Sequence, residues 1–329
     1  MTYDCFSFFN ELDLLEIRLN ILDKVVDKFI LVESTLTHTG NPKPLYYEQN
    51  LGRFAQFNDR IIHIVVDDFP SFPDATPREM AWIRENWQRN AIMRGIPKDA
   101  KDTDYLIISD LDEIPSPEAV TTAMSYNGIS HLNLKFYSYF LNYRNYFTPI
   151  WTGGGQILPL GIIRHSKAPC DTELDLIVDR RVNHGMTPTL VRHLRPHHII
   201  KNAGWHFSFC GGTEAVRAKM KAYAHTEINT PESTSRHNIE RKVHSGMAPY
   251  NNPDRFFAIR LGRSFPKYIC DNTDRLSHLI YPITPLYLAK SAIPRIIVVM
   301  KRYGTILLRP ILPRNIKDWL YHHILENCH

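Results

Sequence analysis

Three carboxylates stand within four positions behind an apolar run of the chain. The segment "SDLDEIP" places Asp110, Asp112 and Glu113 directly after the residues "YLII". Carboxylates this close repel one another and lose hydration on burial unless a cation or a hydrogen-bond donor compensates. A hard divalent cation such as Mg²⁺ or Mn²⁺ suits such oxygen ligands and would bridge them to phosphate oxygens. The alternative is that Asp110 or Asp112 caps the helix expected after the two following prolines.

Strands alternate with helices along the residues that lead to this segment. Apolar runs predict strands at 3–9, 28–34, 60–68 and 104–110, and helical spacing predicts helices at 11–27, 46–57 and 78–94. This order predicts an α/β fold with a doubly wound, mainly parallel, Rossmann-like sheet. Ligands bind such sheets outside the carboxyl ends of the strands. Glu33, Asp67 and Asp68, which end two other strands, are therefore expected to line the same edge.

A second group of polar side chains follows in "NAGWHFSFCGGTEAVRAKMKAYAHTE" (202–227). A strand, a Gly-Gly turn and a helix from about residue 213 are expected there. Trp205, His206, Ser208 and Glu214 would then come together near one strand end and one helix start. His206 could complete a metal shell or contact a diphosphate, and a structural histidine is the alternative reading. Upstream aromatic side chains could stack on sugar or base faces or pack in the core: Tyr143, Tyr146, Phe147 and Trp151.

Several long motifs resemble glycosyltransferase family seventeen, which contains the bisecting N-acetylglucosaminyltransferases and shorter microbial relatives. They are the opening stretch "YDCFSFFNELDLLEIRLNILDKVVDKFILVEST", then "QRNAI", "SDLDEIP" and "AGWHFSFCGGTE", in order over about residues 3–250. The resemblance implies a GT-A-like fold and an inverting enzyme. It also implies a UDP-sugar donor, UDP-N-acetylglucosamine above all, with Mn²⁺ or Mg²⁺ bound by a DxD element.

The resemblance also assigns roles to individual residues. Asp110 and Asp112 match the DxD element, with Asp112 as the more direct metal ligand, and His206 is similar to a late histidine that faces metal or diphosphate. The donor contacts that it implies are Arg89 for the diphosphate, Glu33 for the nucleoside, and Asp110 and Trp205 beside them. We expect the acceptor to be a glycan or a lipid-linked glycan, and the resemblance indicates the donor class better than the acceptor.

Inversion needs a base that takes the proton of the acceptor hydroxyl and an electrophile that stabilises departing UDP. We expect Glu214, which follows a Gly-Gly turn, to be the base, although it could equally stabilise the first turn of its helix. Glu173 in "DTELD" is the second candidate. The competing functions are a sugar nucleotidyltransferase, which would use the same aspartates and release pyrophosphate, and a glycan-binding protein without catalysis.

The excess positive charge lies at the carboxyl end of the chain. Residues 285–329 carry seven Lys or Arg against two carboxylates, which equals the whole net charge of +5, and residues 1–284 balance at 32 against 32. We expect a transferase domain over residues 1–260 and a basic, apolar-rich helical appendage over 261–329. The appendage could lie on an anionic membrane or pack on the core.

Composition excludes several other classes of protein. Five scattered cysteines without a CxxC pair indicate neither a disulfide framework nor a zinc site. No apolar run approaches a membrane span, and the start lacks the pattern of a signal peptide. We expect a cytoplasmic protein, peripheral at the inner membrane face if the appendage binds lipid, with no nucleic-acid partner.

Overall fold

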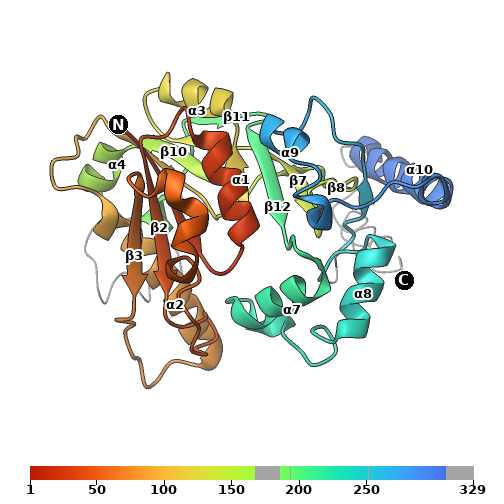
Figure 1. Cartoon of the computed structure of the whole chain (residues 1–329), viewed down its shortest axis with the longest axis horizontal. Coiled ribbons are helices and arrows are strands. Elements are labelled where there is room, and N and C mark those ends of the chain that lie inside the picture. The colour runs from red at the N-terminus through yellow and green to blue at the C-terminus, as the bar shows by residue number, and fades with distance from the viewer. Residues whose placement is uncertain (167–185, 193, 251, 309–329) are drawn as a thin grey trace.

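The computed structural model describes residues 1–166, 186–192, 194–250 and 252–308 (Figure 1). Within them, a larger sheet with helices on both faces stands beside a smaller sheet. The predicted α/β class is confirmed. Glu173, the second candidate base, lies outside the described residues.

The larger sheet has seven strands, in the order β11 (His198–Ile200), β6 (Ser130–Leu132), β10 (Gln156–Pro159), β4 (Tyr105–Ile108), β1 (Thr2–Phe8), β2 (Lys28–Ser34) and β3 (Ile61–Val66). Strand β1 is parallel to β2 and β4, β2 to β3, and β6 to β11, while β10 is antiparallel to both of its neighbours. The sheet is thus mainly parallel, as predicted. Four adjacent strands, β3, β2, β1 and β4, end at one edge.

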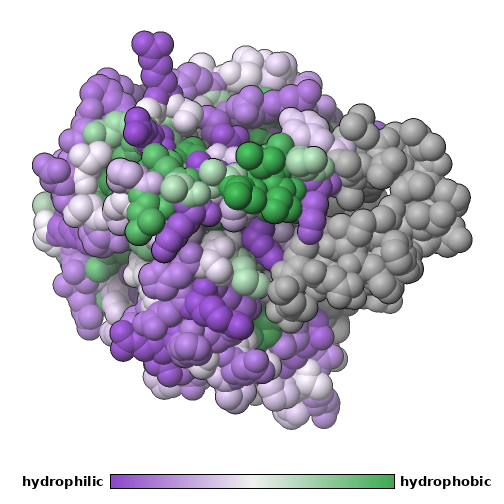
Figure 2. All heavy atoms as spheres, turned by 90° about the vertical axis from the view of Figure 1, so that its right-hand side faces the viewer, coloured by the Kyte–Doolittle hydropathy of each residue, from purple (hydrophilic) through white to green (hydrophobic). Residues whose placement is uncertain are grey.

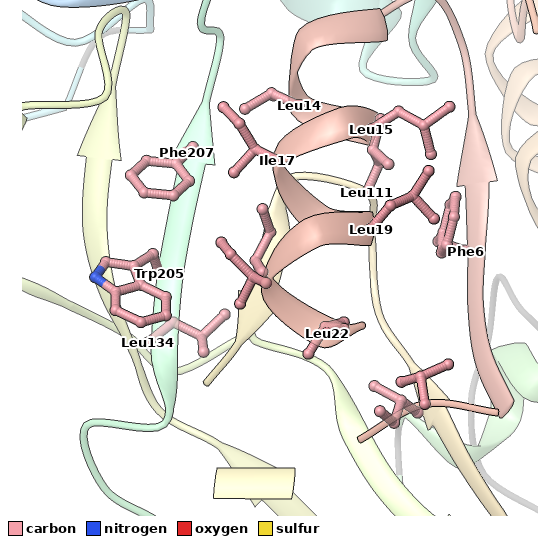
Figure 3. Packing of buried hydrophobic residues seen from close by; sticks show 14 of the residues in the cluster. Phe6, Leu14, Leu15, Ile17, Leu19, Leu22, Leu111, Leu134, Trp205 and Phe207 are labelled. Atoms are coloured by element: carbon pink, nitrogen blue, oxygen red, sulfur yellow. The ribbon is translucent and has the colours of Figure 1, made fainter. Parts of the chain in front are cut away.

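Strand β1 shows how the larger sheet is buried on both faces. Phe6 belongs to the hydrophobic cluster that includes α1 (Leu12–Leu22), whereas Cys5 belongs to the cluster that includes η2 (Ala91–Gly95). Neighbouring strand residues point to opposite faces, so a strand covered on both sides has apolar side chains on both faces, as a near-continuous apolar run rather than an alternating pattern. Figure 3 shows Phe6 beside Leu19 of α1.

The predicted helix at 78–94 forms in two parts. The α-helix α2 (Pro77–Asn90) begins with a capping box between Thr76 and Glu79, and a tighter 3-10 turn, η2, continues from it. Gly95 ends η2 where a Cβ would stand 2.6 Å from the side chain of Ile30. The chain therefore turns close to β2, which a larger residue would prevent, and runs on towards β4.

The smaller sheet stands at the ends of β1 and β4. Its strands are β13 (Phe256–Ala258), β8 (Tyr143–Asn145), β7 (Leu134–Ser138), β12 (Gly204–Ser208) and β5 (Glu113–Pro115), with β9 (Ile150–Trp151) paired to β7. Strand β5 follows β4 after four residues and pairs antiparallel with β12. The carboxylate segment thus lies where the chain passes from one sheet to the other.

Further helices complete the described fold. They are η1 (Glu48–Phe57), where a helix at 46–57 is predicted, α3 (Pro117–Met124), α4 (Leu160–His165), α6 (Pro188–Val191), α7 (Gly212–Ala222), η3 (Thr226–Ile228) and α8 (Arg236–Ser245). Ser116 caps α3, with its hydroxyl accepting from Ala119 N at 3.2 Å. The alternative that Asp110 or Asp112 caps this helix is therefore wrong.

The chain after residue 260 first packs on α1. Helix α9 (Lys267–Asp271) contributes Ile269 to the α1 cluster, and the hydroxyl of Tyr268 donates to Glu16 at 2.8 Å. After η4 (Ser277–Leu279) the described chain ends in α10 (Pro285–Leu308). The division at residue 260 stays a prediction. No helix in the described ranges is long and apolar enough to cross a membrane.

Candidate functional site

A cleft of about 260 Å³ opens at the carboxyl ends of β1, β2 and β4. Loops after β1 and β2, helix α2, the segment 110–113, strand β12 and helix α7 form its wall. Sheets of this kind bind ligands at this edge. Tyrosines aside, the ionisable residues that line it carry both signs of charge: Glu11, His38, Lys43, Glu85, Arg89, Asp110, Asp112, Glu113, His206, Lys219 and His225.

Asp110 is held between two arginines. One of its oxygens, Oδ1, accepts from Arg89 at 3.1 Å and from Arg192 at 3.1 Å. Burial alone would raise the pKa of Asp110, but the charges of Arg192 and Arg89 outweigh it and hold the pKa well below its usual range. Burial would lower the pKa of Arg89, and Asp110 and Glu85 keep it raised instead. The carboxylate of Asp110 and the guanidinium group of Arg89 therefore stay ionised at neutral pH.

Asp112 is more deeply buried and faces α7 and β12. Its Oδ2 accepts from Lys219 Nζ at 2.7 Å, and its Oδ1 lies 3.6 Å from His206 Nε2. Burial opposes ionisation, but Lys219 and His206 hold the pKa of Asp112 below its usual range. Lys219 also lies 3.1 Å from Glu11, and these two carboxylates raise its pKa against the effect of burial.

Glu113 points into the protein beside the same segment. Its Oε1 accepts from the indole of Trp151 at 2.7 Å, and its Oε2 accepts from Asp110 N at 3.2 Å. Burial, with the neighbouring charge of Asp110, raises the pKa of Glu113. Glu113 is thus the carboxylate of the segment that takes up a proton most readily.

Arg18 fixes the backbone of the carboxylate segment. This fully buried arginine of α1 binds Asp4 of β1 through two hydrogen bonds of 2.6 and 2.8 Å. It also donates to the carbonyl oxygens of Asp110, Leu111 and Glu113 at 2.8 to 3.1 Å. A charged anchor of this kind holds a loop conformation that backbone hydrogen bonds alone would not define.

A divalent cation has a partial ligand set in this cleft. Asp112 and His206 face each other at a separation that a cation with bonds of about 2.1 Å to each could bridge. The described residues contain no group of three His, Cys, Asp or Glu side chains suited to a metal ion. Such an ion would therefore need oxygens from a phosphate and from water, which is how Mg²⁺ commonly binds at nucleotide sites.

Two of the predicted donor-binding residues do not line the cleft. Glu33 is fully buried and accepts from His63 at 3.1 Å, from Lys43 at 3.4 Å and from Tyr47 N, so it anchors Lys43 of the cleft wall. Trp205 does not line the cleft, and its indole donates to Ser264 O at 2.9 Å. Figure 3 shows Trp205 near Leu134, and both belong to the hydrophobic cluster that includes the apolar residues of α1.

Glu214 also lies outside the cleft lining. Its side chain is 64% exposed in the first turn of α7, 3.7 Å from Arg217 and 3.8 Å from Arg236. An exposed carboxylate beside two arginines fits the alternative that Glu214 stabilises the first turn of its helix. It does not fit the environment expected of a general base. Asp67 and Asp68 are likewise exposed, and neither lines the cleft. The expectation that carboxylates from three strand ends line one edge holds for β4 alone.

The sequence interpretation does not place four residues in the site. Arg192 and Lys219 reach the segment from distant parts of the chain; the basic stretch that contains Arg192 is interpreted only as loop or anion contacts, and Trp151 is expected only to stack on a ligand or to pack in the core. Arg18 left a local signal: it is a lone cation within an apolar helix face, and Asp4 is a lone carboxylate within an apolar strand. Charges that interrupt two apolar runs predict a buried pair, since either alone would be costly.

The amino-terminal part of the chain matches a known family. Residues 1–151 match the model of glycosyltransferase family 17. This stretch includes Arg18, Arg89 and the segment 110–113, whereas His206 and Lys219 follow it in the chain.

Three curated relatives share one name, β-1,4-mannosyl-glycoprotein 4-β-N-acetylglucosaminyltransferase. The protein of Homo sapiens is 27% identical over 231 residues, which cover 64% of this chain and 41% of the relative. Those of Rattus norvegicus and Mus musculus are 27% and 26% identical over 231 residues, with 64% of this chain and 40% of each relative covered. The chain therefore spans about two fifths of the length of these relatives.

Proposed function

We propose that the protein is a GT-A-type glycosyltransferase. The proposal starts from the match of residues 1–151 to glycosyltransferase family 17. The enzyme transfers a sugar, N-acetylglucosamine above all, from a UDP-sugar to a hydroxyl of a glycan acceptor with inversion, assisted by Mn²⁺ or Mg²⁺. The choice of sugar follows the names of the relatives. Family and names both indicate the glycosyltransferase class.

The observation that carries the proposal is the charge arrangement at the end of β4. Asp110 and Asp112 stand among Arg89, Arg192 and Lys219, with every ion pair at 2.7 to 3.1 Å. A diphosphate needs cations around its oxygens, and a divalent ion beside it needs carboxylates. A cleft that carries both kinds of group at a central strand end suits a nucleotide diphosphate together with its metal ion.

The reaction divides between two sets of groups. The acceptor oxygen attacks the anomeric carbon, the bond from that carbon to the diphosphate oxygen breaks, and UDP leaves. Lys219, Arg89 and Arg192 stabilise the negative charge that develops on the diphosphate. A cation held by Asp112 and His206 would add Lewis-acid stabilisation of the same charge. The base that takes the acceptor proton is not among the assigned residues, and Glu173 stays the candidate.

The test identifies the product that leaves. Purified protein is mixed with Mn²⁺, a panel of UDP-sugars and glycan acceptors, and both free UDP and pyrophosphate are measured. The proposal predicts UDP release that depends on acceptor and metal, with UDP-N-acetylglucosamine as the best donor. Pyrophosphate release would instead identify a sugar nucleotidyltransferase, and glycan binding without turnover would identify a binding protein.

A further inference from the structure

Helix α10 exposes an apolar face over most of its length. Its side chains at a spacing of three and four residues share one face, and most of them are more than half exposed: Leu286, Ala289, Ile293, Ile296, Met300 and Tyr303. The exposed fractions reach 69% for Ile293 and 68% for Met300. Figure 2, seen from the side of the molecule that carries α10, shows apolar residues gathered at the surface beside hydrophilic ones.

The opposite face of α10 holds the helix on the smaller sheet. Arg295 donates to Ala258 O at 2.6 Å and lies over the rings of Tyr146, Phe257 and Tyr287 at 5.4 to 5.7 Å. The hydroxyl of Tyr287 accepts from Ala258 N at 2.6 Å. The exposed apolar face therefore belongs to a helix with a fixed orientation, because the packed side is anchored by specific contacts.

A second cavity, of about 590 Å³, lies along the flank of α10. Its aromatic wall is formed by Tyr143, Phe147, Phe257, Tyr281 and Tyr287. Its ionisable lining among the described residues, tyrosines aside, is His244, Arg255, Lys290 and Lys301, with no carboxylate. Ile297 contributes both to this cavity and to the exposed surface of α10, so the cavity mouth and the apolar face are continuous.

The charges of α10 are of one sign. Between residues 285 and 308 the chain has Lys290, Arg295, Lys301 and Arg302 and no carboxylate. A surface that is apolar along one face and cationic along its flank fits an environment that is apolar and anionic at once. Phospholipid membranes with acidic headgroups have both properties.

We propose that α10 and its flanking cavity form a docking surface for an anionic membrane. The apolar face enters the headgroup region of the lipid, and Lys290 and Lys301 at the cavity mouth contact the phosphates. The helix lies in the plane of the surface, since no described helix can cross a bilayer. This role is separate from glycosyl transfer, and it would bring the transferase cleft to acceptors that are held at a membrane.

Two other occupants fit the charges less well. A second copy packed through the same helix face would bring cations against cations, because residues 285–308 contain four Lys or Arg and no carboxylate. The chain beyond residue 308 has three Lys or Arg against two carboxylates and is itself net positive.

The test measures sedimentation of the full chain with vesicles, without donor or acceptor, so its result does not depend on transferase activity. Neutral phosphatidylcholine vesicles are compared with vesicles that contain about 30 mol% phosphatidylglycerol, at about 50 mM and about 500 mM salt. The variants are Lys290→Glu with Lys301→Glu, and Ile293→Asp alone. The matched control is Lys24→Glu with Lys98→Glu, two exposed lysines on the larger sheet's side of the molecule.

The proposal predicts binding to the acidic vesicles at low salt and little binding to neutral ones. The partition coefficient of Lys290→Glu with Lys301→Glu onto the acidic vesicles should fall by more than about tenfold, since each cation near the surface strengthens binding severalfold. Ile293→Asp should also weaken binding, and the control should keep it. Absence of wild-type binding to acidic vesicles would overturn the proposal. So would equal loss in the control, or a wild-type dimer in solution that Ile293→Asp dissociates without any vesicle binding.

Discussion

The carboxyl ends of β3 and β4 carry similar residues in very different surroundings. At the end of β3, Asp68 accepts from Arg94 at 2.9 Å and from the indole of Trp87 at 3.3 Å, and its side chain is 51% exposed. At the end of β4, Asp112 is 8% exposed and bound by Lys219. Both ends thus show a carboxylate paired with a cation, and only one of them lines a cleft.

The difference comes from the position of each strand in the sheet. Strand β3 is an edge strand, whereas β4 lies inside the sheet and its end is covered by β5, β12 and α7. An exposed ion pair contributes little, because water screens it. A buried pair must keep both partners, since one charge left alone is costly. Burial therefore turns the same kind of strand end into a fixed, charged site.

The largest expected effect is the loss of stability when Arg18, which anchors the segment after β4, is replaced. Arg18→Met should lower the free energy of unfolding by about 3–5 kcal/mol, because it leaves Asp4 buried without its partner. Chemical denaturation monitored by circular dichroism measures the change. The double variant Arg18→Met with Asp4→Leu should recover part of the loss. A single variant as stable as the wild type would show that the pair does not hold the segment.

The next effect compares two arginines on neighbouring turns. Arg89→Met should lower kcat/KM for the UDP-sugar by roughly 10²-fold, since it removes a preorganised donor beside the diphosphate. Arg94→Met removes the partner of Asp68 at the exposed end of β3 and should change kcat/KM by less than about twofold. Steady-state kinetics with UDP release as the readout measures both. Equal losses of kcat/KM in the two variants would contradict the claim that only the end of β4 binds the donor.

A smaller effect concerns acid stability. The folded protein holds the pKa of Asp112 below that of the unfolded chain, so the unfolded chain takes up the proton first as the pH falls. The stability from this carboxylate is present above about pH 4 and is lost as the pH drops towards the folded pKa. The free energy of unfolding between pH 5 and pH 3 should therefore fall less steeply in Asp112→Asn than in the wild type. Asp68→Asn should change the slope less, and the reverse order would contradict this account.

The smallest effect is expected at Glu214. Because its side chain is exposed and paired only with surface arginines, Glu214→Gln should change kcat less than about threefold. Loss of a general base usually costs 10²-fold or more. A fall of that size, with unchanged affinity for the donor, would restore Glu214 as the base.

The sequence predicts the fold and the carboxylate segment because both depend on local pattern. Apolar runs that end in charge mark strand ends, and Asp110 and Asp112 line the cleft as expected. Alternation along a strand does not reveal which face meets the cleft, so His206 lines the cleft as expected and its neighbour Trp205 does not. Arg192 and Lys219 reach the site only through tertiary packing, so the spacing of residues along the chain does not predict their contacts with Asp110 and Asp112.

The most direct test of the central claim is UDP binding at the end of β4. Isothermal titration of UDP into wild type, Asp112→Asn and Asp68→Asn, with and without Mn²⁺, separates the two strand ends without any acceptor. The account predicts Mn²⁺-dependent binding by the wild type and by Asp68→Asn. It predicts that Asp112→Asn stays folded and loses that dependence. Unchanged Mn²⁺-dependent binding by Asp112→Asn would contradict the assignment of the donor site.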